Sequence, residues 1–401
     1  MDQQEKLGDT DRTVLQIWAA FVAVLLAFSW KLWLPGFSDF PRVPIFDVHD
    51  GAWLSLLQYF GTTVLVVGLV GLASGVIKFR WAAVCVSAAF SILFCCNQHC
   101  LQPWAWQAFI IATLLASMPI DEARRWAARL LISIYLFSAI GKFDYQFVHT
   151  TGQEFLDVIL GWTASVVRVD SLSDALRAKL VLLFPVGELL IAVGLIFQPT
   201  RKLAAWLAIV LHVLLMLVLS PVGLSHRWPV VIWNGMSILL VYWLFLSNAQ
   251  STDATGRRQA NERVGTVQRL GVVFSMVVLF GPLLRPVQYW DHWLAWGLYS
   301  PSNSRVELLV SDVARDRIDV LLQPYFVESQ KMPGSSRFAM DRWSLDELGV
   351  PIYPQARFQK SAVLRWLRAN DMQGLAKLIE YGPSHPMTGR RSSSAVALPE
   401  N

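Results

Sequence analysis

The chain is short of charge for a protein that folds in water. Charged residues make up 16% of its 401 residues, whereas a soluble domain carries about 25%. Hydrophobic residues make up 54%, and the eighteen tryptophans suit a protein with aromatic rings at membrane interfaces. The net charge of +5 is modest and spread over short loops, which indicates membrane topology and argues against a nucleic-acid partner.

The sequence also lacks the motifs of several functional classes. It contains no HExxH motif and no paired-histidine spacing, so no metal site is predicted. It has no phosphate-cradling glycine-rich loop and no internal repeat. Because secondary transporters show inverted repeats, a transporter or proton relay that uses Glu188 ranks last among the functions considered.

The N-terminus lacks the features of a cleavable signal peptide. Residues Met1–Thr13 are polar and mixed in charge, and no small-residue cleavage site follows the apolar run Val14–Leu34. We therefore expect residues 1–13 to form a cytoplasmic segment and Val14–Leu34 to be an uncleaved first span.

Long apolar runs dominate residues 14–286, and a membrane span needs roughly twenty such residues. Nine candidate spans are predicted: Val14–Leu34, Ala52–Ala73, Trp81–Cys96, Pro103–Met118, Ala127–Lys142, Leu180–Phe197, Leu203–Ser220, Trp228–Leu246 and Leu270–Leu284. The predicted fold is an all-α polytopic membrane helical bundle of about nine spans, followed by a small C-terminal α+β domain outside the membrane.

Loop charge sets the orientation. With the N-terminus in the cytoplasm, thirteen Lys and Arg residues fall in inner loops and five in outer loops, which favours this orientation. An odd number of spans then places the chain after Arg285 outside, and one miscounted span reverses its side.

Residues 287–385 are expected to form the outer α+β domain, and residues 386–401 a disordered C-terminus. Alternating apolar and polar residues predict strands at Arg305–Val310 and Ile318–Leu322. A capping-box pattern at Ser344–Glu347 predicts the start of a short helix. Two further helices are predicted at Gln355–Ala369 and Met372–Tyr381.

Three ionisable side chains lie within or at the edge of apolar runs. They are Lys142, Glu188 and His212. Charged side chains in hydrocarbon are costly, so they usually face a bundle interior or a water-filled cavity. We therefore treat the three as candidate catalytic residues. An apolar site strips solvation from an ammonium group, which makes the neutral lysine amine available as a base.

Each candidate has a structural alternative. Lys142 stands at the outer end of its helix and can snorkel to the lipid headgroups, where Asp144 would keep it charged. Glu188 is either neutral or paired with Lys142 or a protonated His212, and such a buried pair can simply fix helix register. His212 alone on an apolar helix suits a hydrogen-bonded core residue. Asn234 is a candidate binding residue that bridges helices or a ligand.

Two further pairs are suggested by position. Cys96 and Cys100 are disulfide candidates if their loop faces an oxidising compartment. Arg285 and Asp291 flank the outer end of the last span and are expected to form an interfacial ion pair.

The segment Tyr135–Asp144, YLFSAIGKFD, resembles the aromatic-rich helix ending in Gly-x-Lys-Leu-Asp of the vitamin K-dependent gamma-glutamyl carboxylase and its bacterial relatives, the horizontally transferred transmembrane (HTTM) proteins. Phe184–Leu189 and the later His212 resemble the next two helices, and this stretch is also similar to the smaller DoxX and MauE membrane proteins. Gln288–Tyr299 is similar to the aromatic segment after the last carboxylase span. The likeness covers roughly residues 127–300 and implies a bacterial inner membrane protein.

The resemblance implies roles for these residues. In the carboxylase, the lysine that matches Lys142 is the base that starts hydroquinone oxidation, so a quinone is a candidate cofactor. Glu188 and His212 would support that lysine, with Tyr135 and Asp144 as further binding residues. The chain departs from the family in two ways. Its motif has a single lysine, preceded by Gly141, where the family has two adjacent lysines, and its tail is too small for a propeptide-binding domain.

Two functions follow. The first is a quinone- or redox-linked membrane enzyme, which requires Lys142, Glu188 and His212 to converge. The second is a non-enzymatic accessory protein of the MauE or DoxX type that presents its outer tail to a protein partner. Membrane lipids are expected partners in both cases.

Overall fold

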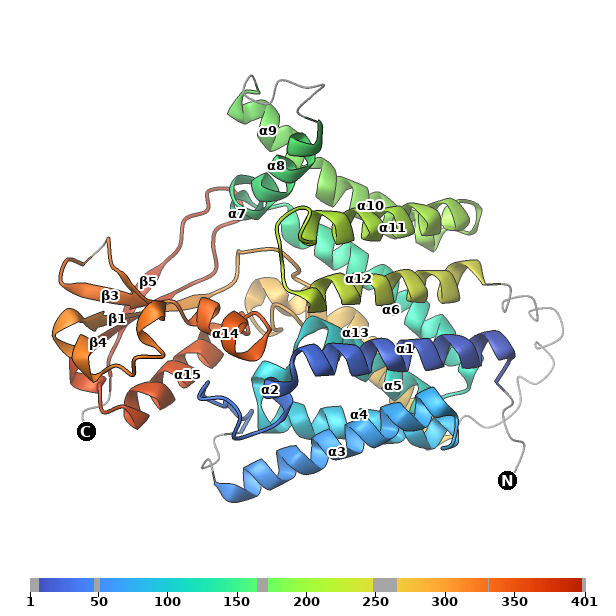
Figure 1. Ribbon diagram of the computed structural model, residues 1–401. Helices are drawn as coiled ribbons and strands as arrows, with labels where there is room; N and C mark the ends of the chain where they lie inside the picture. The colour runs from blue at the N-terminus through green and yellow to red at the C-terminus, as the bar shows by residue number, and fades with distance from the viewer. Residues whose placement is uncertain (1–6, 47–50, 164–171, 248–264, 331, 399–401) are drawn as a thin grey trace.

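The computed structural model describes residues 7–46, 51–163, 172–247, 265–330 and 332–398 (Figure 1). Most of these residues are helical, and a small sheet lies at one end of the helical bundle. The first described residues lie at the opposite end of the bundle from the sheet, separated from it by the length of the helices.

The bundle helices follow the apolar runs of the sequence. They are α1 (Asp9–Phe28), α2 (Trp30–Trp33), α3 (Ala52–Ser74), α4 (Phe79–Cys96), α5 (Pro103–Ser117), α6 (Ile120–Lys142), α7 (Tyr145–His149), α8 (Thr151–Thr163), α9 (Asp174–Val181), α10 (Leu183–Ile196), α11 (Gln198–Leu219), α12 (Trp228–Val241) and α13 (Thr266–Phe280). A π-helical turn, Tyr242–Leu246, continues α12, and a 3₁₀ segment, Gly281–Val287, continues α13.

Seven helices of the described chain are long and apolar enough to cross a membrane, and α6 with the α7–α8 segment, bent by 70°, would make an eighth. The expected fourth span, Pro103–Met118, is a helix of 15 residues that is almost entirely buried among its neighbours. The described fold is therefore that of a multi-pass membrane protein, with fewer full-length apolar helices than the nine expected.

Two expected spans are interrupted. The first breaks at Ser29, whose hydroxyl donates to Leu25 O at 2.8 Å while α2 begins at the next residue. The sixth is divided at Leu182 into α9 and α10. Pro185 has no N–H to donate to the carbonyl four residues earlier, so the helix loses a hydrogen bond at this break.

Close helix packing relies on small residues where helices cross. α3 packs along α4, and a Cβ atom added to Gly68 of α3 would lie 2.8 Å from Val86 and 3.1 Å from the Ala82 carbonyl. Only glycine permits this approach, as in other membrane helix pairs. α6 packs on α10, α11 packs on α12, and α1 lies between α3 and α12.

A buried ion pair fastens the end of the bundle where the chain begins. Arg124 of α6 donates to Asp11 of α1 at 3.0 Å and to the Trp243 carbonyl at 2.8 Å. The indole N–H of Trp243 donates to the same Asp11 oxygen at 2.8 Å. The π-helical turn that contains Trp243 supplies this carbonyl, in keeping with the use of π-bulges to free backbone groups.

The C-terminal tail is a five-stranded antiparallel sheet covered by helices. Its strands are β1 (Arg305–Ser311), β2 (Phe326–Glu328), β3 (Ser335–Phe338), β4 (Ala376–Tyr381) and β5 (Ser393–Val396), in the spatial order β2-β3-β1-β4-β5. The helices are α14 (Met340–Leu348) and α15 (Ala356–Ala369), of which α15 packs on β1 and β4. The strand at Arg305–Val310 and the helix at Gln355–Ala369 are confirmed.

Four expectations for the tail are wrong. Ile318–Leu322 forms turns, and the partner strand of β1 on that side is β3. Met372–Tyr381 is mainly strand β4, because it pairs with β1 along six residues and with β5 on its other edge. Residues 393–396, predicted to be disordered, are β5.

The fourth concerns Ser344, predicted to cap a helix. It lies inside α14, fully buried, and its hydroxyl donates to Val350 O at 2.8 Å.

The tail and the bundle share one hydrophobic core. Phe40, from the α2–α3 connection, packs on Trp343 of α14 with ring centroids 4.7 Å apart. His99 contacts the ring of Phe358 of α15 at 5.1 Å between centroids. A salt bridge of 2.9 Å joins Lys31 to Glu347 at the rim of this contact. The tail is therefore docked on the end of the bundle by burial of aromatic side chains.

Candidate functional site

Lys142 and Glu188 form a buried ion pair between α6 and α10. The lysine amine lies 2.6 and 2.7 Å from the two carboxylate oxygens, and 2.7 Å from the hydroxyl of Ser138 one turn earlier on α6. Lys142 and Glu188 are 3% and 7% exposed. Because three acceptors surround the amine, its donors are satisfied inside the protein, and the snorkelling alternative is wrong.

A second polar group lies beside this pair. The hydroxyl of Tyr135 is 2.7 Å from Nε2 of His212, and Nδ1 of the same ring is 2.8 Å from the side-chain oxygen of Asn234. An amide oxygen only accepts, so Nδ1 carries the proton and Nε2 accepts from Tyr135. The Asn234 amide nitrogen in turn donates to Val230 O at 2.8 Å. In the neutral ring this arrangement fixes the tautomer, with the proton on Nδ1.

Both groups line one cavity of about 60 Å³, bounded by α6, α10, α11 and α12. Lys142, Glu188, His212, Tyr135 and Asn234 all contribute to its wall. The convergence required of the three catalytic candidates is therefore present. The cavity has room for water molecules only.

Asp144 does not join the site. Its carboxylate caps α7 by accepting from the backbone N–H of Phe147 at 2.9 Å, and it accepts from the Ser300 hydroxyl at 3.0 Å. The expected partner of Lys142, Asp144, is therefore wrong, and Glu188 takes that place. Asp144 instead joins the end of α6 to the segment that enters the tail.

A larger chamber adjoins the small cavity at the tail-bearing end of the bundle. It has a volume of about 560 Å³ and a mostly apolar wall, within the size range of small-molecule sites, about 300–1,000 Å³. Trp233, Leu298 and Tyr299 belong to the walls of both the chamber and the small cavity. These three side chains therefore separate the chamber from the polar site.

Tyr299 has two unusual features at this partition. Its φ angle is +57°, a left-handed conformation that is rare for a bulky residue and is associated with functional strain. Its buried hydroxyl has no hydrogen-bond partner among the described residues. The ring packs on Phe155 of α8 with centroids 5.3 Å apart. The sequence pattern predicted Tyr299 only as part of an aromatic segment and gave no role to Ser138. The spacing of four residues between Ser138 and Lys142 places both on one helix face, which is a usable signal.

Burial keeps the two histidines of the chamber wall neutral. His292 is buried, and its Nε2–H donates to Ser300 O at 2.8 Å; burial together with the nearby Arg285 lowers its pKa to about 3. Burial also lowers the pKa of His226 in the α11–α12 connection. The two histidines therefore add no positive charge to the chamber wall at neutral pH, and its acidic and basic residues are Glu154 and Arg227.

Two sequence-based pairings are wrong. Cys96 and Cys100 are free thiols, as are the other two cysteines of the chain. The Cys100 thiol is buried and points to Leu32 O at 3.8 Å, and burial raises its pKa well above the usual value. Arg285 donates to Ser302, whereas Asp291 pairs with Arg357. Tyr353 also donates to Asp291, at 2.6 Å.

The site does not fit a quinone at the lysine. A cavity of about 60 Å³ is far below the volume of small-molecule pockets, about 300 Å³ or more, and Glu188 and Ser138 occupy the amine. No group of three or more metal-ligating side chains occurs in the part of the chain that the structure describes.

Comparison of the chain with protein-family models, with curated proteins and with solved structures finds no match.

Proposed function

We propose that this chain is a membrane-embedded enzyme of the carboxylase-like HTTM group, working by acid–base chemistry at Lys142 and Glu188. The observation that supports it is the convergence of an amine, a carboxylate, an imidazole and a phenol on one sheltered cavity. Groups in such a place exchange protons without competition from bulk water. By loop charge, the tail and the chamber face the outer side of a bacterial inner membrane.

The chamber suggests how a substrate reaches the pair. An apolar small molecule held there would be separated from Glu188 only by the partition at Trp233, Leu298 and Tyr299. Rotation of the Tyr299 side chain would connect the two spaces. A proton taken by Glu188 or Lys142 has a second polar group at hand, the Tyr135–His212–Asn234 chain.

The test compares cells that express the chain with cells that express single variants, by untargeted profiling of lipids and small molecules. Lys142→Ala and Glu188→Gln should both accumulate the same substrate and lose the same product. Lys179→Ala removes an exposed lysine outside the site and is the matched control. Profiles of Lys142→Ala and Glu188→Gln that equal the wild type would overturn the proposed activity.

A second candidate is the non-enzymatic accessory protein. It is favoured by the hydrogen bonds of Lys142, whose amine donors are all satisfied by Ser138 and Glu188, as expected for a residue that only holds two helices together. It also draws on the tail, where β5 is an edge strand that pairs only with β4 in the described sheet. Such an edge can accept a strand of a protein partner. Full biological activity of Lys142→Ala, together with its loss on Ala395→Pro, would favour this function.

A further inference from the structure

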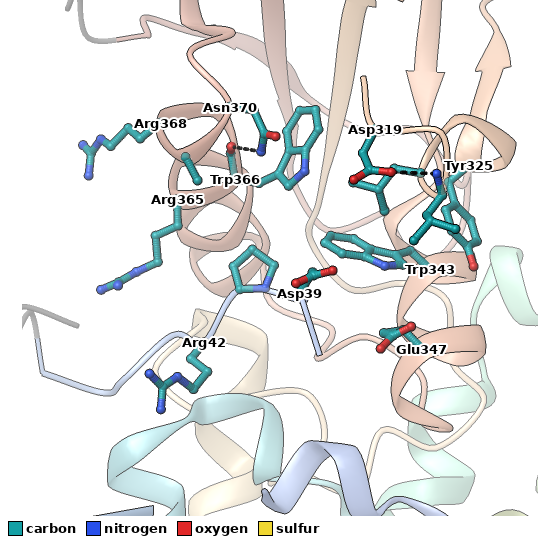
Figure 2. A pocket seen from close by; sticks show the side chains of 14 residues that line it. Asp39, Arg42, Asp319, Tyr325, Trp343, Glu347, Arg365, Trp366, Arg368 and Asn370 are labelled. Carbon is teal, nitrogen blue, oxygen red and sulfur yellow. Dashed lines mark hydrogen bonds between the residues drawn. The ribbon is translucent and has the colours of Figure 1, made fainter. Parts of the chain in front are cut away.

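A separate cleft lies between the bundle and the tail, away from the acid–base site. It has a volume of about 890 Å³ and is lined by the α2–α3 connection, the turns before β2, and helices α14 and α15. Figure 2 shows its side chains. Arg42, Arg365 and Arg368 lie along one side, whereas Asp319 and Glu347 lie on the other. The cleft therefore has a cationic wall and an acidic wall.

Aromatic side chains form the surface between the two walls. Trp343 and Trp366 are 2% and 4% exposed and line the cleft from α14 and α15, and Tyr325 stands beside the acidic wall (Figure 2). The rings of Trp343 and Trp366 therefore form the packed floor of the cleft.

The surroundings of the cleft resemble a lipid-facing interface. Phe37 and Phe46 flank Arg42 in the α2–α3 connection and are 52% and 65% exposed, and Trp53 and Leu56 on the first turns of α3 are exposed as well. Aromatic residues with nearby arginines are typical of the headgroup level of a bilayer. The rim of the cleft thus carries exposed apolar surface suited to acyl chains.

We propose that this cleft binds the headgroup of an aminophospholipid. The phosphate would lie against the arginine wall, since guanidinium groups bind phosphate in a bidentate manner. The ammonium would lie near Asp39 and the acidic wall. A headgroup with both charges matches both walls. Glu347 already pairs with Lys31, so an anionic headgroup would be repelled by the carboxylates of Asp39 and Asp319. This inference does not depend on the acid–base site.

The test uses native mass spectrometry of the purified, delipidated full-length chain. Phosphatidylethanolamine, phosphatidylcholine and phosphatidylglycerol are added separately at equal concentrations. Phosphatidylethanolamine should bind about tenfold more tightly than the other two, because only it offers both a phosphate and ammonium N–H donors. Soluble O-phosphoethanolamine should compete only at far higher concentration, because it lacks the acyl chains that rest on the exposed apolar residues.

Variants test which wall of the cleft binds the phosphate and which binds the ammonium. Arg365→Gln with Arg368→Gln should weaken phosphatidylethanolamine binding by about tenfold or more. Asp39→Asn should keep the binding of phosphatidylglycerol and remove the preference for phosphatidylethanolamine. Arg337→Gln with Arg390→Gln changes the same charge at exposed tail positions outside the cleft and should behave as wild type.

Three results would each overturn the proposal. They are equal binding of the three lipids by the wild type, unchanged binding in the Arg365/Arg368 variant, and competition by the soluble headgroup at the concentration of the lipid. Thermal unfolding midpoints of all variants, compared with the wild type, separate loss of the cleft from loss of the fold.

Discussion

The amine of Lys142 lies between the two carboxylate oxygens of Glu188, at 2.6 and 2.7 Å, although the residues are 46 positions apart in the chain. This pair joins α6 to α10 within the bundle. Because the pair is buried, removing one partner should destabilise the protein strongly, whereas replacing both partners by apolar residues of similar size should not. The difference between these two changes distinguishes a structural role of the pair from a chemical one.

The pair can be tested by comparing broken and replaced versions. Glu188→Gln should lower the free energy of unfolding in detergent by about 3–5 kcal/mol, because it leaves a buried ammonium without its counter-charge. The double variant Lys142→Met with Glu188→Leu should recover most of that loss. If the pair is chemical, the recovered variant remains inactive in the metabolite comparison. Asp157→Asn, which breaks the exposed pair with Arg177, should change stability by less than about 1 kcal/mol.

The Tyr135–His212 contact should behave as a coupled pair. Tyr135→Phe removes the donor to Nε2 and should lower the free energy of unfolding by about 1–2 kcal/mol. In a His212→Leu background the same change should have little effect, because the acceptor is gone. Chemical unfolding in micelles measures both, and equal effects in the two backgrounds would contradict the contact. Tyr242→Phe, at a half-exposed position, is the control.

Acid should weaken the docking of the tail through His99. This residue is fully buried, its Nε2–H donates to Pro351 O at 3.2 Å, and burial lowers its pKa to about 4. The unfolded chain binds a proton near pH 6.5, so stability is complete above that pH and falls as the pH drops from about 6.5 to 4. The loss is about 3 kcal/mol at most, and it should appear as a lower melting temperature at pH 5 than at pH 7. In His99→Gln, the part of the pH dependence due to this residue should vanish.

Gly349 should not tolerate a side chain, because an added Cβ would collide with the bundle. Gly334, which has a similar backbone conformation but no close neighbour, is the control. The φ of Gly349 is +72°, and an added Cβ would lie 2.7 Å from the Phe28 carbonyl at the end of α1. Gly334 has a similar φ of +76° and no atom within 4 Å. Gly334→Ala should therefore cost only the backbone strain, about 1 kcal/mol, and Gly349→Ala clearly more. Thermal unfolding measures the difference, and equal costs would show that the close contact between tail and bundle does not matter.

Much of the bundle could be predicted because long apolar runs are typical of membrane helices. Ala52–Ala73 and Trp81–Cys96 agree with α3 and α4 within two residues. α7 and α8 gave no prediction, since they are short and lie between apolar runs. The strand β4 carries apolar residues at helical spacing, and its strand state comes from pairing with β1 and β5, a long-range effect that a local pattern does not contain.

The candidate site was predictable in part for the same reason. Lys142, Glu188 and His212 stood out because ionisable groups are rare in apolar runs. The pairing of Lys142 with Glu188 was one of several options that the sequence allowed. No local pattern predicted the hydrogen bond between Tyr135 and His212. Asp291 illustrates the limit: its neighbour in sequence was Arg285, whereas its actual partner, Arg357, is brought to it by the folding of the tail.

The shared core of bundle and tail has a consequence for biosynthesis. Phe40 and His99 are translated early, yet the rings that cover them, Trp343 and Phe358, emerge from the ribosome near the end. Until then, this end of the inserted helices exposes hydrophobic surface and is prone to aggregation. A message truncated before α14 should therefore yield an aggregating polypeptide that quality-control proteases remove, even though every membrane helix has already been made.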